Sequence, residues 1–228
     1  MMHKNSSPFV QTTGRLALFP DSTHIRNDSL SIAGHDLAAL ADQYGTPLYV
    51  YDRATLEASV KAYTDALAAF YPSASRVTYA GKAILCKAIA GWTQTHDLFV
   101  DCTGEGEIAI ARAGGVPPKN ILVHGFYKSA FVLQAALKDD GTIVVDNLTE
   151  IKRIAKLLES GGLPPSSQEQ APALQIWLRL LPGVAVATHH SHTQTGQHDS
   201  KFGMTREEIL QAVQVSRSAN MQVNGIHF

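Results

Sequence analysis

The sequence lacks the features that mark several large classes of protein. It has two cysteines, Cys86 and Cys102, which are too few for a disulfide framework and typical of a reducing compartment. No stretch approaches the roughly 20 apolar residues of a membrane span, and residues 1–10 lack the apolar core of a secretory signal. The 19 basic and 20 acidic residues nearly balance. We therefore expect a cytoplasmic protein that binds neither nucleic acid nor membrane.

What the sequence does contain is a regular alternation of strand and helix patterns from residue 76 onward. Such an alternation indicates parallel βα units with right-handed crossovers. Six strands suit either an open doubly wound sheet or a (β/α)8 barrel that stops short of its last two strands. We predict strands at 76–80, 98–101, 121–124, 142–146, 174–181 and 223–228, and helices at 56–70, 84–95, 105–113, 129–138, 148–160 and 206–219.

The first part of the chain gives weaker signals. Residues 1–30 are polar and irregular, with a weak strand pattern near Leu16–Phe19. A helical spacing of apolar residues begins after Ala33 and ends at Gly45. The aromatic and β-branched run Leu48–Tyr51 then predicts a strand.

Polar residues stand at or just after the ends of successive predicted strands. In parallel α/β folds the carboxyl ends of the strands form the catalytic edge. One polar residue at a strand end is ordinary, but five in succession predict a functional site. A lysine in such a place can react with a carbonyl cofactor when burial keeps its amine neutral. The five residues are Lys82, Asp101, His124, Asp146 and Arg179.

Two other patterns have simpler explanations. Residues 104–109 match the G-x-G-x-x-G/A dinucleotide fingerprint, but the following strand ends at His124 and not at the acidic residue that would bind a ribose. A glycine-rich helix start describes this segment better. Four histidines between residues 189 and 198 resemble a metal-binding tract, but no Cys, Asp or Glu completes a zinc-like spacing. We therefore predict neither a nicotinamide site nor a metal site.

Eight segments, in this order, resemble the diaminopimelate decarboxylases, a family of alanine-racemase-like, fold-type III pyridoxal-phosphate enzymes. The resemblance covers about residues 45–228. One segment differs from the family pattern: residues 124–128 read HGFYK, where the family tends to have His-Gly-Asn-Asn-Lys. The segments are 46–52 (TPLYVYD), 79–83 (YAGKA), 101–107 (DCTGEGE), 124–129 (HGFYKS), 146–147 (DN), 178–183 (LRLLPG), 195–203 (TGQHDSKFG) and 225–228 (GIHF).

The resemblance implies a fold and an assembly. Residues 46–228 would form an incomplete α/β domain, a (β/α)8 TIM barrel of the pyridoxal-phosphate-binding type that stops after about six strands. Residues 1–45 would be an N-terminal segment of a second, β-rich domain. The family forms homodimers. Its members continue beyond the segment that ends at Phe228, so we expect this chain to be a fragment, inactive by itself.

The resemblance also implies a chemistry. Lys82 would be the Schiff-base lysine for pyridoxal 5'-phosphate, with Asp101 in the pocket layer near it and His124 and Arg179 beside the cofactor ring; His227 would also contact the cofactor. The family activity is decarboxylation of meso-2,6-diaminopimelate to L-lysine and carbon dioxide in lysine biosynthesis. Two alternatives stay open. One is a related decarboxylase of ornithine, arginine or carboxynorspermidine, and the other is a truncated remnant without catalysis.

Overall fold

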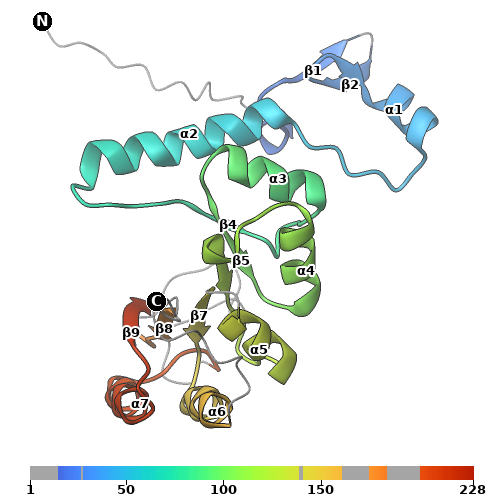
Figure 1. The fold of residues 1–228 in the computed structure, drawn as a ribbon. Helices are drawn as coiled ribbons and strands as arrows, with labels where there is room; N and C mark the ends of the chain where they lie inside the picture. Colours follow the sequence, from blue (N-terminus) through green and yellow to red (C-terminus); the bar gives the residue numbers. More distant parts are fainter. Residues whose placement is uncertain (1–14, 27, 139–140, 161–174, 184–200) are drawn as a thin grey trace, which may run out of the picture. The chain divides into compact units, whose positions relative to one another are not determined.

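The computed structural model describes residues 15–26, 28–138, 141–160, 175–183 and 201–228 (Figure 1). The chain divides into two compact units, residues 1–75 and 76–228. The predicted boundary after residue 45 therefore lies inside the first unit. The reason is local: the Ser22 hydroxyl donates to Asp52 Oδ2 at 2.9 Å, and the Asp21 amide donates to Thr55 Oγ1 at 3.0 Å, which joins the following helix to the residues before it.

The first unit holds a small antiparallel sheet followed by two helices. The sheet has the order β1-β2-β3, with β1 Thr23–Arg26, β2 Ser29–Ile32 and β3 His35–Asp36. Asp36 caps α1 (Leu37–Tyr44) by accepting a hydrogen bond from the Ala39 amide at 3.0 Å. Asp52 caps α2 (Arg53–Phe70) in the same way. The predicted helix after Ala33 is confirmed as α1.

Two predicted strands in this unit are wrong. Arg15–Leu18 forms a 3-10 helix (η1) where a weak strand was expected. Residues 48–51 are irregular, because this run pairs with no strand in the described part of the chain and its side chains are exposed. Strands β1 to β3 were not predicted, since they are two to four residues long and too short to show an alternating pattern.

The second unit is built on six parallel strands in the order β4-β5-β6-β7-β8-β9. All six predicted strands and the predicted helices between them are confirmed, with small shifts at their ends. The strands are β4 Thr78–Ala80, β5 Phe99–Cys102, β6 Ile121–Val123, β7 Thr142–Val145, β8 Gln175–Arg179 and β9 Val223–His227. The helices are α3 Lys87–Thr95, α4 Glu105–Ala113, α5 Ala130–Lys138, α6 Leu148–Glu159 and α7 Arg206–Ser218, with a 3-10 turn, η2, at Pro118–Asn120.

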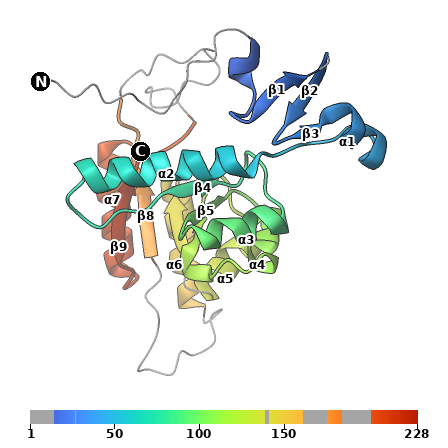
Figure 2. The ribbon, with the colours of Figure 1, turned by 90° about the horizontal axis from the view of Figure 1, so that it is seen from above.

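The strand order distinguishes the two architectures that the sequence left open. Each strand pairs with the next one along the chain, whereas a doubly wound sheet reverses its order at a switch point. In Figure 1, α3 to α7 follow one another around the outside of the strands, and Figure 2 gives the same unit from above. The predicted barrel with about six strands is confirmed.

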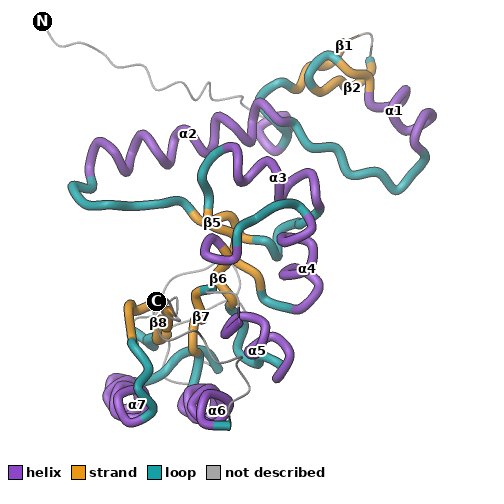
Figure 3. The backbone as a smooth tube through the Cα atoms, viewed as in Figure 1, coloured by secondary structure: helices purple, strands orange, loops and turns teal. Residues whose placement is uncertain are grey.

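The two faces of the strands have different surroundings. Because side chains alternate along a strand, Val100, Cys102 and Val145 point to the helices and are fully buried in the apolar core. The tube in Figure 3 shows the helices on that side of the strands. The other face carries the residues of the pocket described below. None of the described helices combines the length and the apolar character that crossing a bilayer requires.

Candidate active site

A pocket of about 920 Å³ lies on the inner face of the strands, toward their carboxyl ends. Parallel strands end at one edge of a sheet, so residues far apart in the sequence meet there. The pocket contains one predicted residue from each of five strand ends, and Trp177 of β8 adds an aromatic wall. The structure thus brings together Lys82, Asp101, His124, Arg179 and His227.

Lys82 is held by a close contact between two strands. Its neighbour Gly81 donates its amide to the Asp101 carbonyl at 2.9 Å. A Cβ atom on Gly81 would lie 2.6 Å from that same carbonyl oxygen, so only glycine fits there. The Lys82 side chain is exposed. The described residues therefore place Lys82 in the lining of the pocket.

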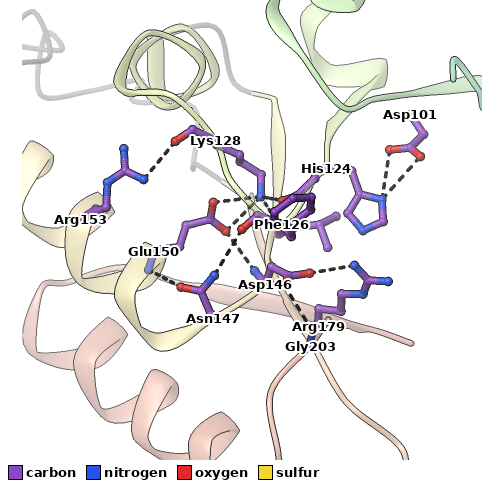
Figure 4. Close-up of polar contacts among 12 residues, drawn as sticks. Asp101, His124, Phe126, Lys128, Asp146, Asn147, Glu150, Arg153, Arg179 and Gly203 are labelled. Atoms are coloured by element: carbon purple, nitrogen blue, oxygen red, sulfur yellow. Dashed lines mark hydrogen bonds and ion pairs between the residues drawn. The ribbon is translucent and has the colours of Figure 1, made fainter. Parts of the chain in front are cut away.

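Asp101 and His124 form a pair across neighbouring strands (Figure 4). His124 Nδ1 lies 3.3 Å from Asp101 Oδ1 and 3.5 Å from Oδ2, with both side chains largely buried. The carboxylate favours a proton on Nδ1, which leaves Nε2 of a neutral ring as an acceptor. His124 Nε2 is buried and has no hydrogen-bond partner among the described residues. The pair therefore presents one oriented, unpartnered nitrogen.

His227 on β9 packs against His124. The ring centroids are 4.6 Å apart at an interplanar angle of 64°. Burial, with smaller contributions from the nearby His124 and Arg179, lowers the pKa of His227 to about 4. The ring is therefore neutral near pH 7. Its Nδ1 is also buried without a hydrogen-bond partner in the described part of the chain.

Arg179 is fixed from two sides. Its Nη1 donates to Asp146 Oδ1 at 2.7 Å, and Asp146 is almost fully buried. The guanidinium carbon lies 4.6 Å from the centroid of the Phe202 ring, a cation–π distance. The amide of Gly203 also donates to Asp146 Oδ2, at 3.4 Å. Asp146, which the sequence placed at a strand end, thus anchors Arg179.

A buried ion pair behind the pocket was not predicted. Lys128 Nζ donates to Glu150 Oε2 at 2.9 Å, and the two side chains are 0% and 3% exposed. Burial lowers the pKa of Lys128, while the Glu150 carboxylate opposes that shift. In the sequence, Glu150 resembles an ordinary acidic residue in the first turn of a helix. The available signal was the position of Lys128 within the segment 124–129 (HGFYKS).

The residues of this pocket fit a pyridoxal phosphate group. An unpartnered buried polar atom is rare in proteins and indicates a missing partner. Among the described residues the pocket has such nitrogen atoms on His124 and His227. Lys82 offers an amine for an aldehyde, and Arg179 offers a fixed positive charge. No group of three or more His, Cys, Asp or Glu side chains that could hold a metal ion occurs among the described residues. The histidines of 189–198 lie outside those residues.

A sequence model of one protein family matches residues 53–228 of this chain. The family is described as pyridoxal-dependent decarboxylase, pyridoxal binding domain. All six parallel strands, and every pocket residue named above, lie within the matched range. The match and the pocket therefore concern the same part of the chain.

Several similar proteins are diaminopimelate decarboxylases. The enzyme of Synechocystis sp. is 33% identical over 212 residues, covering 89% of this chain and 43% of that protein. The enzyme of Bacillus subtilis is 36% identical over 202 residues, covering 87% and 44%. The enzyme of Mycobacterium tuberculosis is 38% identical over 176 residues, covering 76% and 36%.

Solved structures of diaminopimelate decarboxylases are also similar to this chain. Diaminopimelate decarboxylase from Helicobacter pylori, complexed with L-lysine, has a TM-score of 0.70 and 27% identity, covering 84% of this chain and 46% of that one. The enzyme from M. jannaschii in complex with L-lysine has a TM-score of 0.75 at 23% identity, covering 91% and 47%, which shows a shared fold. This chain spans less than half the length of each of these relatives.

Proposed function

This chain belongs to the family of pyridoxal-dependent decarboxylases, and on that premise we propose that the protein decarboxylates meso-2,6-diaminopimelate to L-lysine and carbon dioxide. Three relatives with 33–38% identity are diaminopimelate decarboxylases, which supports this substrate. The observation that carries the proposal is the pocket, where five residues from separate strand ends meet. Two of them are histidines, each with an imidazole nitrogen that has no hydrogen-bond partner among the described residues. The homodimer and the cytoplasmic location stay predictions.

In this proposal Lys82 is the residue that holds the cofactor. Its amine would bind the aldehyde of pyridoxal phosphate, which supplies an electron sink for the pair of electrons left when the carboxyl group departs. The tight Gly81–Asp101 contact keeps Lys82 next to the Asp101–His124 pair.

The remaining pocket residues bind and orient. Asp101 orients His124 so that Nε2 faces a ligand as an acceptor. His227 is neutral near pH 7 and can hydrogen-bond through Nδ1 without adding charge. Asp146 fixes the direction of the Arg179 guanidinium, so it can hold an anionic group of cofactor or substrate. Phe202 and Trp177 add apolar walls that exclude water.

The first test is cofactor binding by the complete gene product. The cofactor's absorbance should shift on binding to the wild type and to Lys87→Ala, a control at an exposed lysine on α3. The same shift should be lost in Lys82→Ala. A shift that persists in Lys82→Ala would show that another residue holds the cofactor.

The second test is turnover. The loaded protein is incubated separately with meso-2,6-diaminopimelate, L-ornithine, L-arginine and carboxynorspermidine, and the amine products are measured by mass spectrometry. L-lysine from the first substrate alone is the expected result. Turnover of one of the other substrates instead would assign the protein to the related decarboxylases of ornithine, arginine or carboxynorspermidine. Cofactor binding without turnover of any substrate would favour the non-catalytic alternative.

A further inference from the structure

The ammonium group of Lys128 is fully surrounded by acceptors. Its Nζ lies 2.7 Å from the Gly125 carbonyl, 2.7 Å from the Val144 carbonyl, and 3.1 and 2.9 Å from the two oxygens of Glu150. The three protons of an ammonium group therefore all have partners. Lys128 itself does not line the pocket. Its interactions nevertheless extend to the pocket through two separate routes.

The first route runs through Glu150 to Arg179. Glu150 Oε2, which accepts from Lys128, also accepts from the Asp146 backbone amide at 3.0 Å. The carboxylate of Asp146 in turn holds Arg179 at 2.7 Å. Figure 4 shows this series of contacts from the buried pair to the guanidinium. A shift of Glu150 would therefore move the backbone that carries the anchor of Arg179.

The second route runs through Gly125 to His124. Gly125 directly follows His124, and its φ of 98° lies in a region that favours glycine. A Cβ there would also lie 3.1 Å from the Thr103 carbonyl oxygen. Lys128 holds the Gly125 carbonyl and so fixes the turn at which His124 enters the pocket. One buried ammonium group is thus connected to two pocket residues on different strands.

A purely stabilising role does not account for this arrangement. Burying two charges is costly, and apolar residues of similar size are often as stable as a buried ion pair. The pair satisfies backbone groups at the ends of two neighbouring strands, which apolar side chains cannot do. We propose that Lys128 and Glu150 are positioning residues that set the directions of Arg179 and His124 and, through them, the affinity of the pocket for its ligand.

The test separates positioning from folding with a double variant, Lys128→Met with Glu150→Gln. A single Lys128→Met change leaves a buried carboxylate without its cation and endangers the fold. In the double variant both charges are gone, while the glutamine amide oxygen can still accept from the Asp146 amide. Lys152→Met on the exposed face of α6 is the matched control, because it also replaces a lysine by methionine. Thermal unfolding shows that each protein is folded.

Two readouts are measured on the folded proteins. The first is hydrogen exchange at the Arg179 Nη–H groups by ¹H–¹⁵N NMR, which needs no ligand. Because Nη1 donates to Asp146, exchange should be slow in the wild type and the control and at least about tenfold faster in the double variant. The second is the dissociation constant for pyridoxal phosphate, which should rise by about 10- to 100-fold, as for a displaced binding group. The second readout rests on the proposed function, whereas the first does not.

Unchanged Arg179 exchange in a folded double variant would overturn the positioning role. Faster Arg179 exchange in a double variant whose affinity for pyridoxal phosphate stays within twofold of the wild type would show that the positioning does not affect binding of the cofactor. Failure of the wild type to bind pyridoxal phosphate would count against the proposed function, and the exchange rates would still decide the positioning role.

Discussion

At the scale of single residues, His227 gives the clearest dependence on pH. Its pKa falls from an ordinary 6.5 to about 4 in the folded chain. Between these values the unfolded chain binds a proton at this position and the folded chain does not. The contribution of His227 to the free energy of unfolding should therefore fall as the pH drops from 6.5 to 4, by on the order of 3 kcal/mol, and change no further below that window.

NMR titration of the His227 Cε1 proton checks this directly. The chemical shift should stay constant between pH 7.5 and 5.5 and change near pH 4. Urea unfolding of His227→Gln should lose the corresponding part of the pH dependence. A titration midpoint near 6.5 would mean that the ring is not buried beside His124 and Arg179 as described.

The two cysteines should differ sharply in reactivity. Cys102 on β5 is fully buried, and burial raises its pKa to about 12, with a further contribution from Glu107. Its thiolate, the reactive form, is therefore scarce at neutral pH. Cys86 is exposed. Iodoacetamide followed by peptide mass spectrometry should label Cys86 in the native chain and both residues in guanidinium chloride; equal labelling in the native chain would contradict the buried position of Cys102.

At the scale of elements, the turn after β4 tests how the pocket is assembled. The added methyl group of Gly81→Ala would meet the Asp101 carbonyl oxygen at 2.6 Å and force β4 and β5 apart. We expect a loss of about 1–3 kcal/mol in the free energy of unfolding, as for other overpacked sites. Urea unfolding measures this value.

Gly106→Ala is the matched control for that substitution. Gly106 lies in α4, and a Cβ there would meet no atom within 4 Å. Because alanine favours the helix, this change should leave stability equal or raise it by up to about 1 kcal/mol. Similar losses in both variants would show that the close contact at Gly81 is not the cause.

The elements of the second unit could be predicted because each leaves a strong local pattern. A strand such as β7 is buried on both faces, which gives a continuous apolar run at Thr142–Val145. Two of the helices between the strands also begin at a recognisable capping residue, Asn147 for α6 and Thr205 for α7. In the first unit, β3 has only two residues, and its existence depends on its pairing with β2. Pairing of this kind leaves no periodicity to recognise.

The candidate site was predictable to the extent that its residues share a place in a repeated unit. Strand ends converge in any parallel barrel, so His124 and Arg179 could be assigned to one site from position alone. Lys128 and Glu150 could not, because their contact joins residues 22 positions apart on different elements. A sequence gives no distance between two such side chains. Their burial, which makes the pair notable, appears only once the helices are packed.

At the scale of the whole molecule, the open sides of the parallel sheet have a consequence for association. Among the described residues β4 and β9 each pair with a strand on one side only. An unpaired strand edge is a template for pairing with another chain. Ile226 on β9 is 56% exposed, and Phe228, which directly follows this strand, is 86% exposed, so the region of this edge is also apolar. We expect the 228-residue chain to self-associate through β9 at micromolar concentration.

Ile226→Lys on β9 should reduce this association, because a charge on an edge strand opposes pairing with a second copy. Leu210→Lys on α7 is the matched control, since Leu210 is similarly exposed, at 57%, but lies on a helix without free pairing groups. Sedimentation velocity over a range of concentrations should show smaller species for Ile226→Lys than for Leu210→Lys. A monomeric wild type would show that the β9 edge does not drive association. An equal effect of the two variants would show the same, because a contact along the β9 edge should be weakened by a charge at residue 226 and not by a charge at residue 210.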